Sequence, residues 1–93
     1  LRIGIVGAGY IAQAHAAAYA RVGRSRAQIV GVADPQLERA KALAAPHQAR
    51  AVESVEALLE LGVDAVSLCV PTPLHHATAL SALRAGKHVL CEK

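Results

Sequence analysis

Phe, Trp and Met are absent from the 93 residues, and Tyr10 and Tyr19 are the only aromatic residues apart from histidine. Any core must therefore be built from the aliphatic residues that dominate the 54% apolar share. This composition favours buried parallel strands covered by alanine-rich helices. Two tyrosines also provide few stacking platforms for single-stranded nucleic acids, so we expect no nucleic-acid partner.

Basic clusters, cysteine frameworks and long apolar segments are lacking as well. The ten Lys and Arg residues are scattered among seven acidic residues, which is typical of a solvated surface. Cys69 and Cys91 fit neither a disulfide framework nor a C-x-x-C metal site, so we expect two buried thiols, no metal and a reduced, cytoplasmic setting. The apolar stretch Leu1 to Val6 is too short for a membrane span, and no membrane partner is expected.

Short apolar runs alternate with alanine-rich helical patterns along the chain, and glycine or proline separates them. The length allows one domain. The pattern predicts strand Arg2–Val6, helix Tyr10–Val22, strand Gln28–Ala33, helix Leu37–Ala45, strand Gln48–Val52, helix Val55–Leu61 capped by Ser54, strand Asp64–Val70, helix Leu74–Ala85 and strand Lys87–Cys91. Strands that alternate with helices form a parallel sheet. We therefore expect an α/β, doubly wound Rossmann fold with strand order 3-2-1-4-5.

The turn between the first strand and the first helix has the sequence Gly7-Ala8-Gly9-Tyr10-Ile11-Ala12. Its first glycine can take positive φ, its second lets the backbone approach a pyrophosphate, and the small Ala12 keeps the helix close to the strand. The amide groups at the helix start favour an anion. Glycines also mark ordinary turns, but this position between a strand and a helix predicts that Gly7, Ala8, Gly9, Tyr10, Ile11 and Ala12 bind a dinucleotide.

Asp34 follows the second strand, 25 positions after Gly9. A carboxylate at this spacing accepts hydrogen bonds from the adenosine ribose hydroxyls. It also repels a 2′-phosphate, so the sequence favours NAD over NADP, although the basic Arg39 nearby leaves NADP open. The alternative interpretation is that Asp34 only caps the helix that follows Pro35.

Candidates for chemistry follow the ends of the fourth and fifth strands, near the expected nicotinamide. They are Glu92, Lys93 and the adjacent His75 and His76. From spacing alone, a lysine at a strand end and one of two adjacent histidines are more often exposed surface residues. His15 and Tyr19 lie one helical turn apart, where we expect them to pack together.

At these segments the chain resembles the glucose-fructose oxidoreductase, inositol dehydrogenase and MocA family of NAD(P)-dependent enzymes. The matching stretches are Gly7–Ala12 with His15, Ala33–Pro35, Pro71–His75 and Ala85–Lys93. The last of these is similar to the family signature A-G-K-H-V-x-x-E-K-P. Val70 departs from the family pattern, because many relatives carry threonine before the proline.

The resemblance implies a dehydrogenase that moves a hydride between the nicotinamide and a secondary alcohol or ketone of a sugar, inositol or related polyol. Lys93 would hydrogen-bond the reacting hydroxyl and assist proton transfer, with Glu92 beside it. The resemblance also implies further cofactor contacts from Val70, Pro71, Thr72, His75, Glu92 and Lys93.

The resemblance further implies that residues 1–93 are the NAD(P)-binding part of a longer, homo-oligomeric protein with a second α+β domain. Two other functions remain open from the sequence. One is a Rossmann module that senses NAD or supports a partner without chemistry, which would need Gly7, Gly9 and Asp34 but neither Glu92 nor Lys93. The other is a different two-domain dehydrogenase class, such as a dihydrodipicolinate reductase.

Overall fold

A five-stranded parallel sheet forms the centre of the computed structural model, which describes residues 1–23, 25–70 and 72–91, with the side chains at 72–76 and 91 outside the description. The strands are β1 (Arg2–Val6), β2 (Gln28–Ala33), β3 (Arg50–Val52), β4 (Ala65–Leu68) and β5 (His88–Cys91). Neighbouring strands pair in parallel in the order β3-β2-β1-β4-β5. The predicted Rossmann strand order is confirmed.

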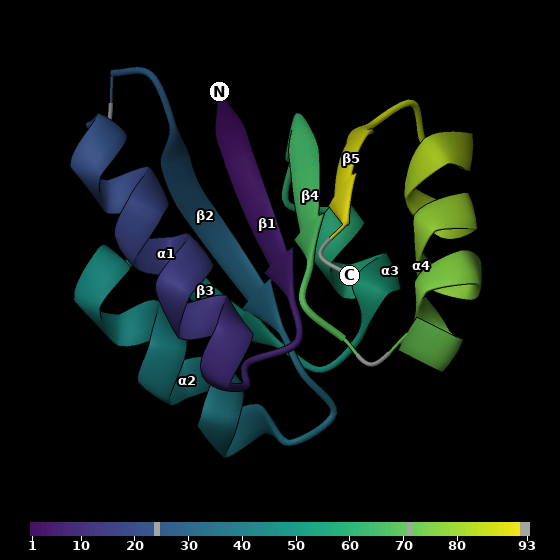
Figure 1. Ribbon diagram of the computed structural model, residues 1–93, viewed down its shortest axis with the longest axis horizontal. Helices are drawn as coiled ribbons and strands as arrows, with labels where there is room; N and C mark the ends of the chain where they lie inside the picture. The colour runs from purple at the N-terminus through teal and green to yellow at the C-terminus, as the bar shows by residue number, and fades with distance from the viewer. Residues whose placement is uncertain (24, 71, 92–93) are drawn as a thin grey trace.

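Helices cover both faces of the sheet (Figure 1). They are α1 (Tyr10–Val22), α2 (Leu37–Ala44), α3 (Val55–Leu59) and α4 (Thr72–Arg84), with a 3-10 turn η1 (Ala45–His47) after α2. Two separate groups of buried residues follow from this layering. Ile3 and Ile5 pack with the alanines of α1 and α2, whereas Val66 and Leu68 pack with Leu58 of α3 and Ala82 of α4.

Small residues let the helices approach the sheet closely. Ala12 and Ala16 of α1 are buried against the sheet. On the other face, a Cβ on Gly31 would stand 2.6 Å from Leu61 Cδ1 and 2.7 Å from Leu58 Cδ1. A Cβ on Gly4 would stand 2.9 Å from Leu58 Cδ2. Both strand glycines therefore make room for Leu58 of α3, and Gly31 also makes room for Leu61 just after that helix, a packing role that the sequence analysis did not predict.

Several predicted boundaries are corrected by local hydrogen bonding. The helix predicted to reach Ala45 ends at Ala44, where Pro46 lies in a 3-10 turn, and Gln48 then takes a left-handed conformation with φ of 56°. The third strand therefore begins at Arg50 instead of Gln48. The predicted cap is confirmed, since Ala57 donates its backbone N–H to Ser54 Oγ at 3.1 Å.

The remaining corrections lie in the second half of the chain. The helix after Ser54 ends at Leu59 instead of Leu61, and Arg2 donates to the carbonyl groups of Leu61 and Gly62 just beyond it at 3.0 and 2.9 Å. The fourth strand covers Ala65–Leu68 instead of Asp64–Val70. Helix α4 covers Thr72–Arg84 instead of Leu74–Ala85, and β5 begins at His88 instead of Lys87. No helix among the described residues is long and apolar enough to span a membrane.

Candidate functional site

The turn after β1 needs glycine at its first position for two independent reasons. Gly7 has φ of 94°, and a Cβ there would stand only 2.7 Å from the carbonyl oxygen of Cys69. The backbone N–H of Gly7 donates to the carbonyl of Ala33 at 2.7 Å, which ties the turn to the end of β2. Any side chain would therefore strain the turn and push it away from the segment after β4.

The first turn of α1 is suited to an anion. Gly9 occupies the N-cap position, where it has no side chain to accept a hydrogen bond from the helix, and the first turn contains no acidic residue. The amide groups of that turn and the partial positive charge of the helix end therefore favour a negatively charged group from outside the chain. Tyr10 begins the helix and is 85% exposed.

Asp34 connects the glycine turn to the segment after β2. Its side chain is only 7% exposed, and Oδ2 accepts a hydrogen bond from the Ala8 amide at 2.8 Å. Oδ1 accepts another from the Gln36 amide at 2.8 Å. The alternative cap interpretation is therefore partly wrong, because the N-cap residue of α2 is Gln36 while Asp34 holds the turn before it. An ionised carboxylate has about four acceptor positions, so roughly two remain for other hydrogen-bond donors.

A groove of about 530 Å³ at the carboxyl ends of the strands brings most of the predicted cofactor residues together. Residues from four segments of the chain line it: Gly7, Ala8, Gly9, Tyr10, Ile11, Asp34, Pro35, Gln36, Arg39, Cys69 and Val70. Ala12 does not line it but is fully buried in the core, in keeping with its expected role of holding α1 close to β1. Ligands of doubly wound sheets bind at this edge, where the strand order reverses.

A second, smaller cavity of about 250 Å³ adjoins this groove on the side of α3 and α4. The two share Gly7, Asp34, Pro35 and Val70, and the smaller one is completed by residues that the sequence analysis did not select: Val6, Ala33, Glu53, Ser54, Val55, Ala77 and Thr78. The sequence could have predicted part of this lining. Residues Glu53 to Val55 directly follow β3, whose carboxyl end lies at the same edge of the sheet as the cofactor groove.

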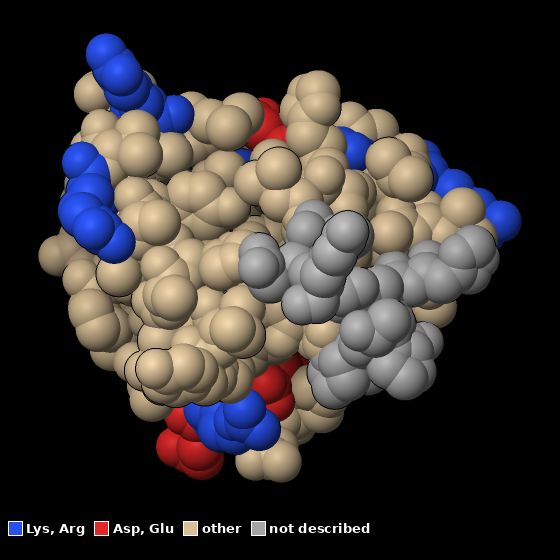
Figure 2. Space-filling model, viewed as in Figure 1, with Lys and Arg blue, Asp and Glu red and all other residues tan. Residues whose placement is uncertain are grey.

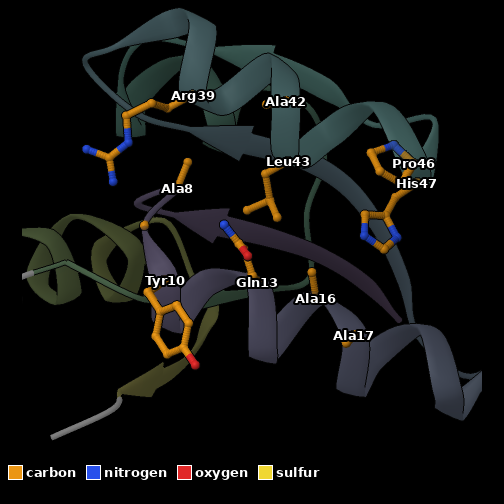
Figure 3. A pocket seen from close by; sticks show the side chains of 11 residues that line it. Ala8, Tyr10, Gln13, Ala16, Ala17, Arg39, Ala42, Leu43, Pro46 and His47 are labelled. Carbon is orange, nitrogen blue, oxygen red and sulfur yellow. The ribbon is translucent and has the colours of Figure 1, made fainter.

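A third groove, of about 580 Å³, runs between α1 and α2 (Figure 3). Alanines of both helices form much of its wall, and Arg39, Gln13 and His47 contribute polar side chains. It meets the cofactor groove at Ala8, Gly9, Tyr10 and Arg39. The two grooves therefore adjoin at the glycine turn, the start of α1 and Arg39.

A buried polar contact lies beneath the glycine turn. Ser67 of β4 is fully buried, and its hydroxyl lies 2.7 Å from His15 Nδ1 of α1. The predicted packing of His15 with Tyr19 is confirmed by an edge-to-face contact with ring centroids 6.5 Å apart. The Ser67 hydroxyl also lies 3.9 Å from Cys69 Sγ. Cys69 is half-buried, so its expected full burial is wrong, and the Cys91 side chain lies outside the description.

Several predicted site residues lie outside the described part of the chain. They are Pro71, Glu92 and Lys93 as whole residues, and Thr72, His75 and His76 as side chains. Across the described ranges, no group of three or more His, Cys, Asp or Glu side chains is placed to hold a metal ion. On the face visible in Figure 2, Lys and Arg side chains lie in several separate places instead of one stripe.

The whole chain, residues 1–93, matches a family model described as an oxidoreductase family with an NAD-binding Rossmann fold. The chain belongs to the glucose-fructose oxidoreductase, inositol dehydrogenase and MocA family. The expectation of a dinucleotide cofactor is thereby confirmed, since the chain forms an NAD-binding Rossmann domain of that family. The match also sets aside a reductase class from outside the family.

Members of this family resemble the chain over its full length. It is 44% identical over 93 residues to UDP-N-acetylglucosamine 3-dehydrogenase of Acidithiobacillus ferrooxidans, covering all of this chain and 28% of that protein. The WlbA dehydrogenase of Bordetella pertussis, solved with NADH and UDP-GlcNAcA, superposes with a TM-score of 0.93 at 36% identity, covering 100% of this chain and 29% of that one.

A second similar structure contains the other form of the cofactor. A 3-ketoreductase from Actinomadura kijaniata, a K102A mutant solved with TDP-benzene and NADP, has a TM-score of 0.88 at 34% identity, covering 98% of this chain and 29% of that one. The chain therefore spans less than a third of the length of these family members.

Proposed function

We propose that this chain is the cofactor-binding domain of an NAD(P)-dependent dehydrogenase. The whole protein would oxidise a secondary alcohol of a sugar, inositol or related polyol, or reduce the matching ketone. The observation that carries this proposal is the groove in which the glycine turn, Asp34 and Val70 meet at the carboxyl edge of the sheet. The dehydrogenase and ketoreductase relatives support the same reaction class.

The residues of the groove fit a dinucleotide. Gly7 and Gly9 line the groove without side chains, and the α1 amides are suited to bind a pyrophosphate. The Asp34 carboxylate, held by the Ala8 and Gln36 amides, would accept hydrogen bonds from the ribose hydroxyls with its remaining lone pairs.

The cavity beside Ser54, Val55 and Thr78 is suited to the adenine ring, because it is narrow, mostly apolar and adjoins Asp34. Val70, which lines both the groove and this cavity, would contact the cofactor where the two meet, and Pro71, Thr72 and His75 would contact it further towards the nicotinamide. When bound, the nicotinamide accepts or supplies a hydride. The chain must orient the cofactor and exclude competing reactions, and these tasks require a rigid turn more than a reactive side chain.

The proposed catalytic residues are Lys93 and Glu92. Strand β5, which precedes them, pairs its last residue Cys91 with Leu68 of β4, so it ends at the same edge as the cofactor groove. Lys93 would hydrogen-bond the reacting hydroxyl and assist its proton transfer, with Glu92 beside it also contacting the cofactor. This assignment rests on the Ala85–Lys93 signature of the family.

The setting of this chemistry is also a proposal. We propose a cytoplasmic homo-oligomer in which a second domain closes over the nicotinamide, and the short span of the chain relative to its relatives supports such a domain. The second candidate function is an NAD sensor without chemistry. The cofactor groove favours the sensor, but the dehydrogenase needs the same groove. The Glu92-Lys93 pair disfavours the sensor, because a sensor needs neither residue.

Turnover by the complete protein separates the two functions. NAD or NADP would be incubated with a panel of sugars, nucleotide sugars and inositols. Formation of NADH or NADPH would be followed by absorbance for wild type, Lys93→Ala and Lys87→Ala. We expect turnover on at least one alcohol, its loss in Lys93→Ala with NADH affinity retained, and little change in the matched Lys87→Ala control. Bound NADH with no turnover of any panel member by wild type would favour the sensor.

A further inference from the structure

A serine interrupts the apolar core in the strand that leads to the cofactor groove. Ser67 is fully buried in β4, where the other residues, Ala65, Val66 and Leu68, are apolar and buried as well. A buried hydroxyl costs free energy unless it is hydrogen-bonded, whereas alanine at this position would need no partner. Packing alone therefore does not explain the serine, and its contacts indicate a further role.

The contacts of Ser67 connect two segments that border the cofactor groove. Its hydroxyl lies 2.7 Å from His15 Nδ1, in the second turn of α1, and 3.9 Å from Cys69 Sγ. Cys69 directly follows β4 and lines the groove, and α1 begins at the glycine turn, which lines the same groove. Three polar side chains thus connect the helix that is suited to bind the pyrophosphate with the segment after β4.

Backbone contacts hold the segment after β4 to a different part of the fold. Cys69 donates its backbone N–H to the carbonyl of Val6 at 2.8 Å. The Cys69 carbonyl oxygen lies 2.7 Å from the point where a Cβ on Gly7 would stand. These contacts join the segment to β1 and the glycine turn, whereas the contact between His15 and Ser67 joins β4 to the body of α1. The side-chain contact therefore limits how far α1 can shift along the sheet.

The other contact of the His15 ring has a separate effect. Tyr19 packs against it edge to face, with ring centroids 6.5 Å apart. Because both residues belong to α1, this packing orients the imidazole but does not position the helix relative to the sheet. Loss of Tyr19 and loss of the Ser67 contact should therefore differ in their consequences for the cofactor groove.

From this arrangement we propose that His15 and Ser67 are positioning residues for the dinucleotide. Their hydrogen bond sets the position of the first turn of α1 relative to Cys69 and Val70, so that both sides of the groove contact the cofactor together. Neither His15 nor Ser67 is among the described residues that line the groove, so they act through α1 and Cys69. This inference rests on the proposed position of the cofactor in that groove.

The expected effect on cofactor affinity is limited in size. One net hydrogen bond favours one arrangement over others by roughly two- to tenfold. Apparent affinity falls in proportion to the fraction of protein that has the binding-competent arrangement. Loss of the contact should therefore weaken NADH binding by a factor within that range.

A comparison of stability with NADH affinity in the complete protein tests the inference. The double variant His15→Leu with Ser67→Ala removes both partners and leaves neither unsatisfied, so its urea midpoint should lie near that of wild type. Its NADH affinity, titrated by fluorescence, should nevertheless be about fivefold lower. His15→Asn keeps a polar group near the position of Nδ1 and should stay within about twofold of wild type. The matched control Tyr19→Leu, which keeps the Ser67 contact, should also stay within about twofold.

Alkylation of Cys69 by iodoacetamide, followed by peptide mass spectrometry, reports directly on the segment after β4. NADH should slow alkylation in wild type, because Cys69 lines the groove. Without cofactor, the double variant should react faster than wild type, because the thiol no longer lies against the Ser67 hydroxyl. If the double variant does not fold, Ser67→Ala replaces it in both measurements.

Several results would overturn the inference. They are an unchanged NADH affinity in the double variant, an equal loss in Tyr19→Leu, an unchanged rate of Cys69 alkylation, and alkylation that bound NADH does not slow. Failure of wild type to bind NADH or NADPH at all would instead refute the proposed function.

Discussion

Two regions of this domain have no room for a side chain at a glycine position, and glycine has a different role in each. At the carboxyl edge, Gly7 lies against the backbone carbonyl of Cys69 with positive φ. Inside the sheet, Gly31 lies against the ends of the Leu58 and Leu61 side chains. The Cys69 carbonyl is part of the backbone and cannot move without moving the chain, whereas the ends of the leucine side chains can change rotamer. The edge therefore depends on glycine for the shape of the site, and the interior depends on it for packing.

The largest effect is expected from Gly7→Ala. The new Cβ would meet the Cys69 carbonyl oxygen at 2.7 Å, so the turn must move away from the segment after β4. NADH affinity should fall by about a hundredfold or more, because two charge-assisted hydrogen bonds to the pyrophosphate together contribute about 3 kcal/mol or more. Titration by fluorescence measures the loss, and an affinity within threefold of wild type would contradict the steric argument.

Gly31→Ala should lower the stability of the fold and leave the NADH affinity almost unchanged. Its Cβ would stand 2.6 Å from Leu61 Cδ1, and overpacking of this kind costs roughly 1 to 3 kcal/mol of unfolding free energy. NADH affinity at a temperature where the protein is folded should change little. Urea unfolding measures the loss, and the double variant Gly31→Ala with Leu61→Ala should recover part of it, because the smaller side chain removes the nearest atom. A hundredfold loss of NADH affinity in Gly31→Ala would contradict the claim that this glycine serves packing and not the site.

Ser67→Ala tests the buried polar contact between β4 and α1. The hydroxyl of Ser67 is fully buried and lies 2.7 Å from His15 Nδ1, so its removal should cost about 1 kcal/mol of unfolding free energy. Comparison of Ser67→Ala, His15→Ala and the double variant isolates the contribution of this contact from the other effects of each change. A Ser67→Ala protein as stable as wild type in urea would show that the contact contributes nothing.

The smallest effect is expected on the outer surface of α2. Lys41 and Glu38 are 57% and 89% exposed, and exposed pairs of this kind typically contribute less than about 0.5 kcal/mol. Lys41→Ala should therefore leave the urea midpoint and the NADH affinity close to those of wild type. A larger loss would indicate that the outer surface of α2 affects the site.

Residues that begin or end helices and strands explain why the fold could be predicted from the sequence. Gly7 and Gly9 separate β1 from α1, Gly23 ends α1 with φ of 97°, and Ser54 caps α3. Each acts locally, so its effect is visible in a window of a few residues. The cofactor groove followed from these local signals, because a parallel sheet places the ends of its strands at one edge.

The contacts that the sequence did not predict join residues far apart in the chain. Gly31 meets Leu61, His15 meets Ser67, and Arg39 reaches Gly9, and no local pattern marks these partners. Asp34 is an intermediate case, since its position after β2 was predicted but its bonds to Ala8 and Gln36 were not. Such contacts depend on how closely the helices approach the sheet. That distance is determined by many alanine and glycine residues together, so no single residue in the sequence predicts it.

The most direct test of the central claim is a crystal structure of the complete protein with NADH. The account predicts the pyrophosphate on the amides at the start of α1, the adenosine ribose on Asp34 and the adenine beside Ser54 and Thr78. A dinucleotide bound elsewhere, or one that does not touch the Gly7–Gly9 turn, would contradict the account.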